Sequence, residues 1–432
     1  MRIFTTLALS LFLSACIHVG GGELRLSQNV NVGARNYTAR QSLDFWQAMQ
    51  QLDFNFAETQ VLTQEQRQFA NGLEMAVGGN YLEAQDTLGQ IFSSSSDSTM
   101  RKNAALILTG LYTLAFDWSA LIGLDSQLPN GLDDMNTIAM IKAWSTCEPE
   151  AIHYPDQPMT LAMEKSMSGV PMIGVLVNGV KQTFWVDTGA EFTVLSSEIA
   201  EECGVMPLIE QSSKVGTATD KKINLLPGMI EELKIGQLVF ENHPVFIIRK
   251  ADLEFRIFKI FKLLKIDGIL GWNAIQNLNL EIDYAQNALK IQKPGIKAYP
   301  IRNFHFLTQP FVTLSDTNGT PLRFFLDTGA NKTSLYAPAF AIFDTSSARK
   351  SRAMVGGAGG MQKITQLELK DQSLILGDTR IDFALIDGKS ALGDAEKGFI
   401  YYDGILGSDI AKDGILTLDF QNGWCELKPG SK

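Results

Sequence analysis

The feature that most limits the possible folds is an internal duplication in the second half of the chain. The tetrapeptide Asp187-Thr188-Gly189-Ala190 recurs as Asp327-Thr328-Gly329-Ala330, 140 positions later. Each copy follows an apolar segment and an Asn-Gly pair, which is a strong hairpin signal. Other landmarks recur in the same order with offsets of 140 or 136 positions: Val215-Gly216 with Val355-Gly356, Asp267–Gly271 with Asp403–Gly407, and Asp283 with Asp419. This constancy predicts two homologous lobes, here called the first lobe (160–297) and the second lobe (298–432).

Both lobes have the sequence character of β structure. Short β-branched and aromatic runs, such as 173–177 and 311–314, alternate with turns rich in Gly, Asn and Asp. The preceding stretch, 38–150, shows helical rather than alternating patterns. We therefore expect a multidomain protein, with an N-terminal α-helical domain followed by a mainly-β bilobal domain.

The duplication has a chemical consequence for Asp187 and Asp327. A single Asp-Thr-Gly is most often an ordinary turn, but two homologous lobes related by a pseudo-two-fold axis can bring both turns together. Two neighbouring carboxyls in a cleft do not both ionise readily, so they share one proton. The ionised carboxylate can then activate a water while the protonated carboxyl donates to a substrate carbonyl. This chemistry hydrolyses amides without a metal or other cofactor, and none is expected.

These motifs resemble those of the retropepsin and pepsin clan of aspartic peptidases. Each lobe carries Asp-Thr-Gly and a later hydrophobic-hydrophobic-Gly motif, Ile269-Leu270-Gly271 and Ile405-Leu406-Gly407. The resemblance implies a bilobal aspartic-peptidase fold with Asp187 and Asp327 as the catalytic dyad of an endopeptidase acting on peptides or proteins. It also implies that Thr188 and Thr328 hydrogen-bond across the axis, beside Gly189 and Gly329.

Two further segments resemble the flaps of retroviral proteases, which hold the peptide backbone over the dyad. The second-lobe segment contains Gly356, Gly357, Ala358 and Gly359, whose glycines permit a mobile hairpin tip. The first-lobe counterpart contains Gly216 and Thr217 and has fewer glycines. An ordinary surface hairpin is the alternative interpretation of the glycine-rich segment.

The residue after each catalytic turn bears on the pH optimum. Ala190 and Ala330 occupy positions where pepsins usually have a hydroxyl residue. A hydroxyl donor there would stabilise the carboxylate and lower its pKa. We therefore expect a less acidic optimum than that of pepsin.

The N-terminus has the pattern of an export signal. A charged start and an apolar run lead to Leu13-Ser14-Ala15-Cys16, which resembles a bacterial lipobox. This predicts a signal peptide over 1–15, lipidation of Cys16 and a flexible tether over 16–37. The predicted location is the outer membrane, facing the periplasm. A conventional signal peptide with a chance Cys is the alternative.

The helical stretch contains two segments that resemble tetratricopeptide hairpins. Gly79-Asn80-Tyr81 and Phe116-Asp117-Trp118 occupy matching turn positions, with Tyr81 and Trp118 separated by 37 residues. That spacing is close to the family period of about 34. The segments predict either a groove for a protein partner or a plain helical bundle that packs on the β-rich half.

Composition excludes some functions and leaves others open. A net charge of −10 argues against a nucleic-acid partner. The remaining cysteines, Cys147, Cys203 and Cys425, have no metal-site spacing; one disulfide is possible, although buried thiols are favoured. The segment 249–265 has Phe at intervals of three and predicts an amphipathic helix. A catalytically inactive peptide-binding module, or a scaffold of a membrane-associated complex, is the alternative to a peptidase.

Overall fold

The computed structural model describes residues 24–28, 42, 44–128, 131, 135–216, 222–257, 261–346, 348–357, 360–389 and 398–430. The predicted signal peptide, Cys16 and most of the predicted tether lie outside these residues, as do Thr217, Ala358 and Gly359. Within the predicted tether, Leu24–Ser27 form strand β1, which pairs antiparallel with β21 (Thr379–Lys389). Among the described residues, none of the helices combines the length and apolar character that a membrane crossing needs.

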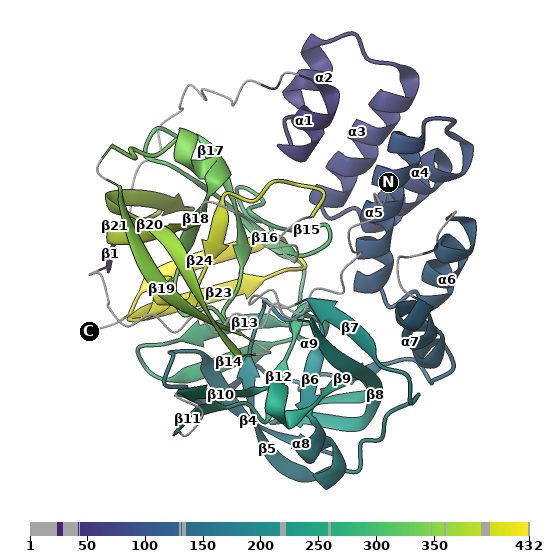
Figure 1. Cartoon of the computed structure of the whole chain (residues 1–432), viewed down its shortest axis with the longest axis vertical. Coiled ribbons are helices and arrows are strands. Elements are labelled where there is room, and N and C mark those ends of the chain that lie inside the picture. The colour runs from purple at the N-terminus through teal and green to yellow at the C-terminus, as the bar shows by residue number, and fades with distance from the viewer. Residues whose placement is uncertain are drawn as a thin grey trace.

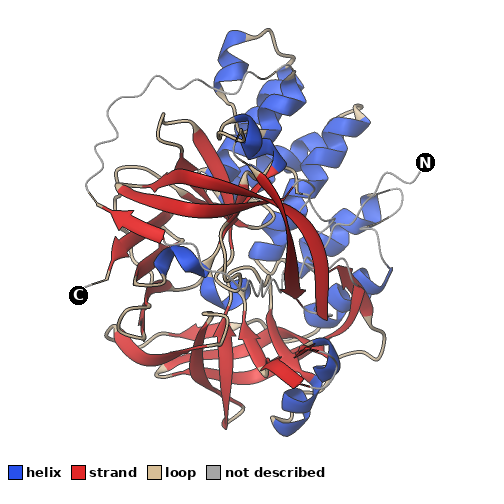
Figure 2. Ribbon diagram, turned by 60° about the vertical axis from the view of Figure 1, so that its left-hand side comes forward, coloured by secondary structure: helices blue, strands red, loops and turns tan. Residues whose placement is uncertain are grey.

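The N-terminal region is helical, and its helices lie together along one side of the β-rich half (Figures 1 and 2). Their bounds are α1 (Phe45–Gln50), α2 (Asn55–Thr59), α3 (Gln64–Val77), α4 (Tyr81–Ser94), α5 (Ser98–Leu114), α6 (Trp118–Gln127) and α7 (Met135–Ser145). Local sequence sets several helix starts: Thr63 and Gln66 form a capping box at α3, while Asp97 and Asp117 cap α5 and α6. Successive helices from α3 to α7 pack against one another.

The two hairpins predicted from the sequence correspond to α3–α4 and α5–α6. Tyr81 and Trp118 are the first residues of α4 and α6, so they occupy matching positions. Gly79 has φ +85° in the first turn, and Phe116 has φ 53° in the second. The helices agree with the predicted positions, whereas a tetratricopeptide relationship stays a prediction.

The β-rich half carries the same arrangement twice. The first copy comprises β2 (Ala151–His153), β3 (Met159–Lys165), β4 (Pro171–Val177), β5 (Val180–Val186), β6 (Thr193–Ser196), α8 (Ser197–Glu202), β7 (Ser213–Gly216), β8 (Lys222–Ile235), β9 (Leu238–Ile248), η1 (Lys250–Asp252), β10 (Glu254–Ile257), β11 (Phe261–Lys265), β12 (Gly268–Leu270), α9 (Trp272–Ile275), β13 (Asn279–Asp283) and β14 (Ala288–Gln292). The second comprises β15 (Phe304–Phe306), β16 (Pro310–Ser315), β17 (Pro321–Leu326), β18 (Ser334–Tyr336), η2 (Ala337–Ala341), β19 (Arg349–Gly357), β20 (Gly360–Leu376), β21, β22 (Gly404–Leu406), η4 (Ser408–Ala411), β23 (Gly414–Asp419) and β24 (Trp424–Pro429).

Strand pairing repeats between the two copies. The hairpin β4–β5 corresponds to β16–β17, the parallel pair β5–β12 to β17–β22, and the parallel pair β6–β9 to β18–β21. Burial follows the strand period: in β4, Ile173, Val175 and Val177 are buried, while Gly174 and Leu176 are exposed. The mainly-β character of this half is confirmed, whereas the exact domain boundaries stay predictions.

The two lobes share one sheet through β13 and β23, which pair antiparallel. Asn279 pairs with Asp419 and Asp283 with Ile415, so the register is symmetric about the pair Glu281 and Thr417. Because equivalent strands of the duplication meet in this way, the shared sheet fixes how the lobes are oriented. This places the pseudo-two-fold axis between the lobes.

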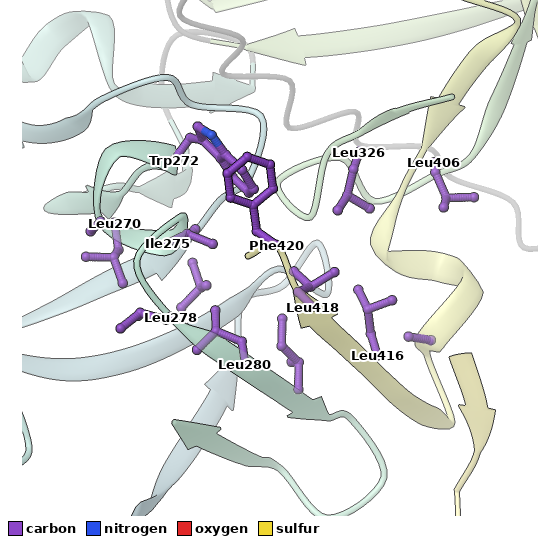
Figure 3. Packing of buried hydrophobic residues seen from close by; sticks show 14 of the residues in the cluster. Leu270, Trp272, Ile275, Leu278, Leu280, Leu326, Leu406, Leu416, Leu418 and Phe420 are labelled. Carbon is purple, nitrogen blue, oxygen red and sulfur yellow. The ribbon is translucent and has the colours of Figure 1, made fainter. Parts of the chain in front are cut away.

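Apolar side chains from both lobes form a continuous core beside this sheet (Figure 3). Equivalent residues of the repeat, such as Leu280 with Leu416 and Leu270 with Leu406, are buried in the same cluster. Burying one such Leu side chain contributes roughly 1.5–3 kcal/mol. The core therefore stabilises the relative position of the turns that carry the two catalytic candidates.

The amphipathic helix predicted over 249–265 is wrong. The described part of this segment holds the short 3-10 helix η1 and the antiparallel strands β10 and β11. In the backbone register of these strands, Phe255 pairs with Leu264 and Ile257 with Phe261. The spacing of three therefore spans residues that belong to two different strands.

The helical region packs on both lobes. The ring centroids of Trp144 in α7 and Phe192 in the first lobe lie 5.1 Å apart, and Trp144 Nε1 donates to Gly228 O at 3.0 Å. On the second lobe, α5 approaches the backbone so closely that a Cβ at Gly110 would lie 2.1 Å from Leu307 O. These contacts make the helices part of the same folded unit as the lobes.

Candidate active site

Each Asp-Thr-Gly turn is supported by two parallel strands. Asp187 directly follows β5, and its N–H donates to Leu270 O of β12 at 3.1 Å. Asp327 directly follows β17, and its N–H donates to Leu406 O of β22 at the same distance. The hydrophobic-hydrophobic-Gly motifs therefore anchor the backbone of each aspartate.

The two threonines form reciprocal hydrogen bonds between the turns. Thr188 N–H donates to Thr328 Oγ1, and Thr328 N–H donates to Thr188 Oγ1, both at 3.0 Å. Each hydroxyl also donates to the opposite strand, Thr188 to Leu326 O and Thr328 to Val186 O, both at 2.8 Å. Because all four bonds are buried, their loss would leave unsatisfied polar groups at the axis. The network fixes the separation of the two turns.

The glycines at the third motif position allow the carboxyls to approach each other. A Cβ added at Gly329 would lie 2.3 Å from Asp187 Oδ2, and one at Gly189 would lie 2.6 Å from Asp327 Cγ. Each carboxyl therefore lies against the opposite turn. Any larger residue at either glycine would displace a carboxyl.

Burial and mutual repulsion govern the protonation of the pair. The exposed fractions of Asp187 and Asp327 are 1% and 0%. Burial is the main reason that the pKa of Asp187 lies well above its ordinary value, and the neighbouring Asp327 charge raises the pKa further. The Gly189 N–H, which donates to Asp187 Oδ1 at 2.8 Å, acts in the opposite direction. The raised pKa of Asp187 favours a proton shared between the two carboxyls.

Two hydrogen-bonded residue pairs support the turns and were not predicted from the sequence. In the first lobe, Thr193 N–H and Oγ1 both donate to Asn273 Oδ1, at 2.7 and 3.0 Å. In the second lobe, Thr333 N–H and Oγ1 donate to Asp409 Oδ1, at 2.9 and 2.7 Å. The two threonines lie 140 positions apart and their partners 136, so the duplication offsets could have revealed both pairs.

The first-lobe brace continues to a histidine. His243 Nε2 lies 2.7 Å from Thr193 Oγ1, while its Nδ1 contacts the Glu150 carboxylate. Hydrogen bonds therefore connect Glu150, which follows the helical region, to the Thr193–Asn273 pair beside the Asp187 turn. Within the described residues, His, Cys, Asp and Glu side chains form no group of three that could hold a metal ion.

The flap candidates lie in hairpins. Gly356 and Gly357 are buried residues at the end of β19, where Gly357 pairs with Gly360 of β20. Gly216 ends β7 and pairs with Lys222 of β8. Hairpins are therefore present at both predicted flap positions, although their tips lie outside the described residues and their binding role stays a prediction.

The helical region packs beside both Asp-Thr-Gly turns. Phe325 and Ala330, on either side of Asp327, belong to one buried cluster with residues of α1 and α3 to α7. Ala190 and Phe192 belong to another with Met140 and Trp144 of α7. The Asp187 and Asp327 turns are therefore flanked by residues that pack against the helical region.

Comparison with known protein families gives a match within the first lobe. A family described as gag-polyprotein putative aspartyl protease matches residues 173–277, which include Asp187 and the Ile269-Leu270-Gly271 motif. This part of the chain is therefore similar to the aspartyl proteases of that family. Asp327 lies outside the matched residues.

Curated relatives match part of the chain. DNA damage-inducible protein 1 of Neurospora crassa is 31% identical over 126 residues, which cover 28% of this chain and 24% of that protein. Protein DDI1 homolog 2 of Mus musculus is 25% identical over 145 residues, which cover 32% of this chain and 33% of that protein. The chain thus spans about a quarter to a third of the length of these relatives.

Two solved structures also align with the chain. A retropepsin-like aspartic protease from Rickettsia conorii aligns with 34% of this chain and 96% of its own length, at 20% identity and a TM-score of 0.24. An aspartic proteinase from Irpex lacteus aligns with 64% of this chain and 98% of its own length, at 12% identity and a TM-score of 0.41.

Proposed function

We propose that the protein is an aspartic endopeptidase whose dyad is Asp187 and Asp327. The observation that carries the proposal is the reciprocal threonine network, which joins two buried Asp-Thr-Gly turns from different lobes. Two neighbouring carboxyls, of which Asp187 has a pKa raised by burial and by Asp327, can supply both a general base and a general acid. The family match to the first lobe supports the same chemistry.

In the proposed mechanism, the ionised carboxyl takes a proton from a water held between the two aspartates. The water oxygen attacks the peptide carbonyl carbon, while the protonated carboxyl donates to the carbonyl oxygen. The resulting tetrahedral diol collapses when the carboxyl that took the water proton donates it to the nitrogen and the other carboxylate removes a proton from a diol hydroxyl, which breaks the C–N bond. Each carboxyl thus returns to its starting protonation state, and no covalent intermediate forms.

A peptide carrying a secondary hydroxyl in place of the scissile carbonyl tests this mechanism, because it mimics the tetrahedral diol. Transition-state analogues bind about 100-fold or more tightly than substrates. We expect this peptide to raise the melting temperature of the purified protein more than its cleavable parent does. In Asp187→Asn the difference between the peptides should largely disappear. Equal stabilisation of the unaltered protein by both peptides would contradict the mechanism.

We further propose that a lipidated Cys16 attaches the protein to the outer membrane, facing the periplasm. The lipobox-like sequence before Cys16 supports this attachment. Cys16→Ser is expected to move the protein from the membrane fraction to the soluble periplasmic fraction, because several acyl chains are lost. Fractionation and metabolic labelling with a fatty acid measure both effects. Unchanged membrane association and no label in the unaltered protein would contradict the proposal.

A further inference from the structure

A cavity of about 680 Å³ lies where the helical region meets the β-rich half. The proposed peptidase mechanism gives this cavity no role. The turn before α4 and the end of α5 form one wall, and residues after α9, β14 and β23 form the other. This volume falls in the range of small-ligand sites, about 300–1,000 Å³. The cavity is therefore large enough for a short end of a peptide.

The charge of the cavity is opposite to that of the protein. Its lining includes Lys293 and Arg302 but no Asp or Glu, although the chain has a net charge of −10. Lys293 Nζ lies 5.4 Å from the ring centroid of Tyr154, and the Arg302 guanidinium donates only to backbone oxygens, those of Phe304 and Gln421. Across the part of the chain that the structure describes, neither cation is paired with a carboxylate. An anionic ligand would supply that missing partner.

A buried hydroxyl in the same cavity also lacks a partner. Tyr81 is stacked on Phe420 with ring centroids 6.2 Å apart, and its Oη makes no hydrogen bond within the described part of the chain. Burial raises the pKa of this phenol, whereas the nearby Arg302 charge lowers it. The hydroxyl therefore remains a neutral donor beside a guanidinium. A donor and a cation side by side match the two oxygens of a carboxylate.

The rest of the cavity is apolar. Leu111, Leu114 and Pro294 line it, and Leu82 at its edge has an exposed fraction of 76%. A fully hydrated inorganic anion would gain nothing from these surfaces. A carboxylate attached to apolar groups would satisfy the polar groups and bury the leucines.

We propose that this cavity binds the free C-terminal carboxylate of a peptide with apolar last residues. Arg302 and the Tyr81 hydroxyl contact the carboxylate, Lys293 adds positive charge, and the leucines contact the terminal side chains. Asp187 and Asp327 do not line this cavity, so the site is separate from the proposed dyad. Fatty acids present the same combination of carboxylate and apolar chain, and the test distinguishes them.

The test uses the purified full chain carrying Asp187→Asn, so that ligands are not consumed and the result does not depend on peptidase activity. Calorimetry measures binding of a short peptide ending in two leucines, as the free acid and as the C-terminal amide, and of decanoate. We expect the free acid to bind and the amide to bind at least about 10-fold more weakly, since a charge-assisted contact is lost. Equal binding of acid and amide, no peptide binding, or binding of decanoate alone would each overturn the proposal.

Variants locate the binding in this cavity. Lys293→Gln and Tyr81→Phe, each added to Asp187→Asn, are expected to weaken acid binding, Lys293→Gln by about 10-fold. Lys297→Gln is the matched control, because Lys297 is an exposed lysine four residues away that does not line the cavity. Loss of affinity in Lys297→Gln equal to that in Lys293→Gln would place the binding elsewhere. Unchanged melting temperatures establish that the variants are folded.

Discussion

Asp187→Asn is expected to lower peptide cleavage by about 1,000-fold or more, because the dyad loses the group that shuttles its proton. The same change is expected to stabilise the protein at neutral pH. Burial and Asp327 raise the pKa of Asp187 above its ordinary value, so the folded state holds this proton more tightly than the unfolded state. Stability is then lost as pH rises from the ordinary value through the raised one.

Melting temperatures measured from pH 4 to pH 8 test this prediction. The unaltered protein should melt at progressively lower temperature as pH rises across this window, and Asp187→Asn should show a weaker decline. Asp156→Asn is the matched control, because Asp156 is exposed and lies outside the site. If Asp187→Asn destabilises the protein at neutral pH while cleavage persists, the proposed coupling of the two carboxyls is incorrect.

Gly329→Ala should inactivate the protein without removing any catalytic group. The new Cβ would lie 2.3 Å from Asp187 Oδ2 and 2.4 Å from its Cγ, so the carboxyl must move. A displacement of this kind is expected to cost about 100-fold in activity, and overpacking a buried site costs about 1–3 kcal/mol of stability. Cleavage assays and the free energy of unfolding measure the two effects.

Gly295→Ala provides the control for this prediction. Its added Cβ would have no heavy atom within 4 Å, so activity and stability should change little. Gly189→Ala should reproduce the loss seen for Gly329→Ala, since its Cβ would lie 2.6 Å from Asp327 Cγ. Full activity in either site variant would show that the two turns are farther apart than the structure places them.

The duplication explains why the centre of this site could be predicted from sequence. Constant offsets identified both Asp-Thr-Gly turns and both supporting motifs, and the structure brings Asp187 and Asp327 together through Thr188 and Thr328. The braces at Thr193 and Thr333 obey the same offsets but have different partners, Asn273 and Asp409. Because Asn273 and Asp409 are different residue types, matching identical residues between the lobes does not reveal these pairs.

Other features depend on contacts that no local pattern records. The segment 249–265 has helix-like spacing, but pairing between β10 and β11 overrides it. Strand β1 lies in a segment predicted as a tether, because β21 offers an edge to which it can pair. The docking of Trp144 against Phe192 likewise joins residues whose sequences give no sign of each other. Long-range packing decided each of these outcomes.

Mapping of cleaved bonds in a peptide library by mass spectrometry tests the central claim most directly. The purified protein, Asp187→Asn and Asp327→Asn are compared from pH 3 to pH 8. The account predicts internal cleavage by the unaltered protein, with an optimum less acidic than that of pepsin, and its loss in both variants. Peptide binding that is equal in all three proteins, with no cleavage by any of them at any pH, would contradict it.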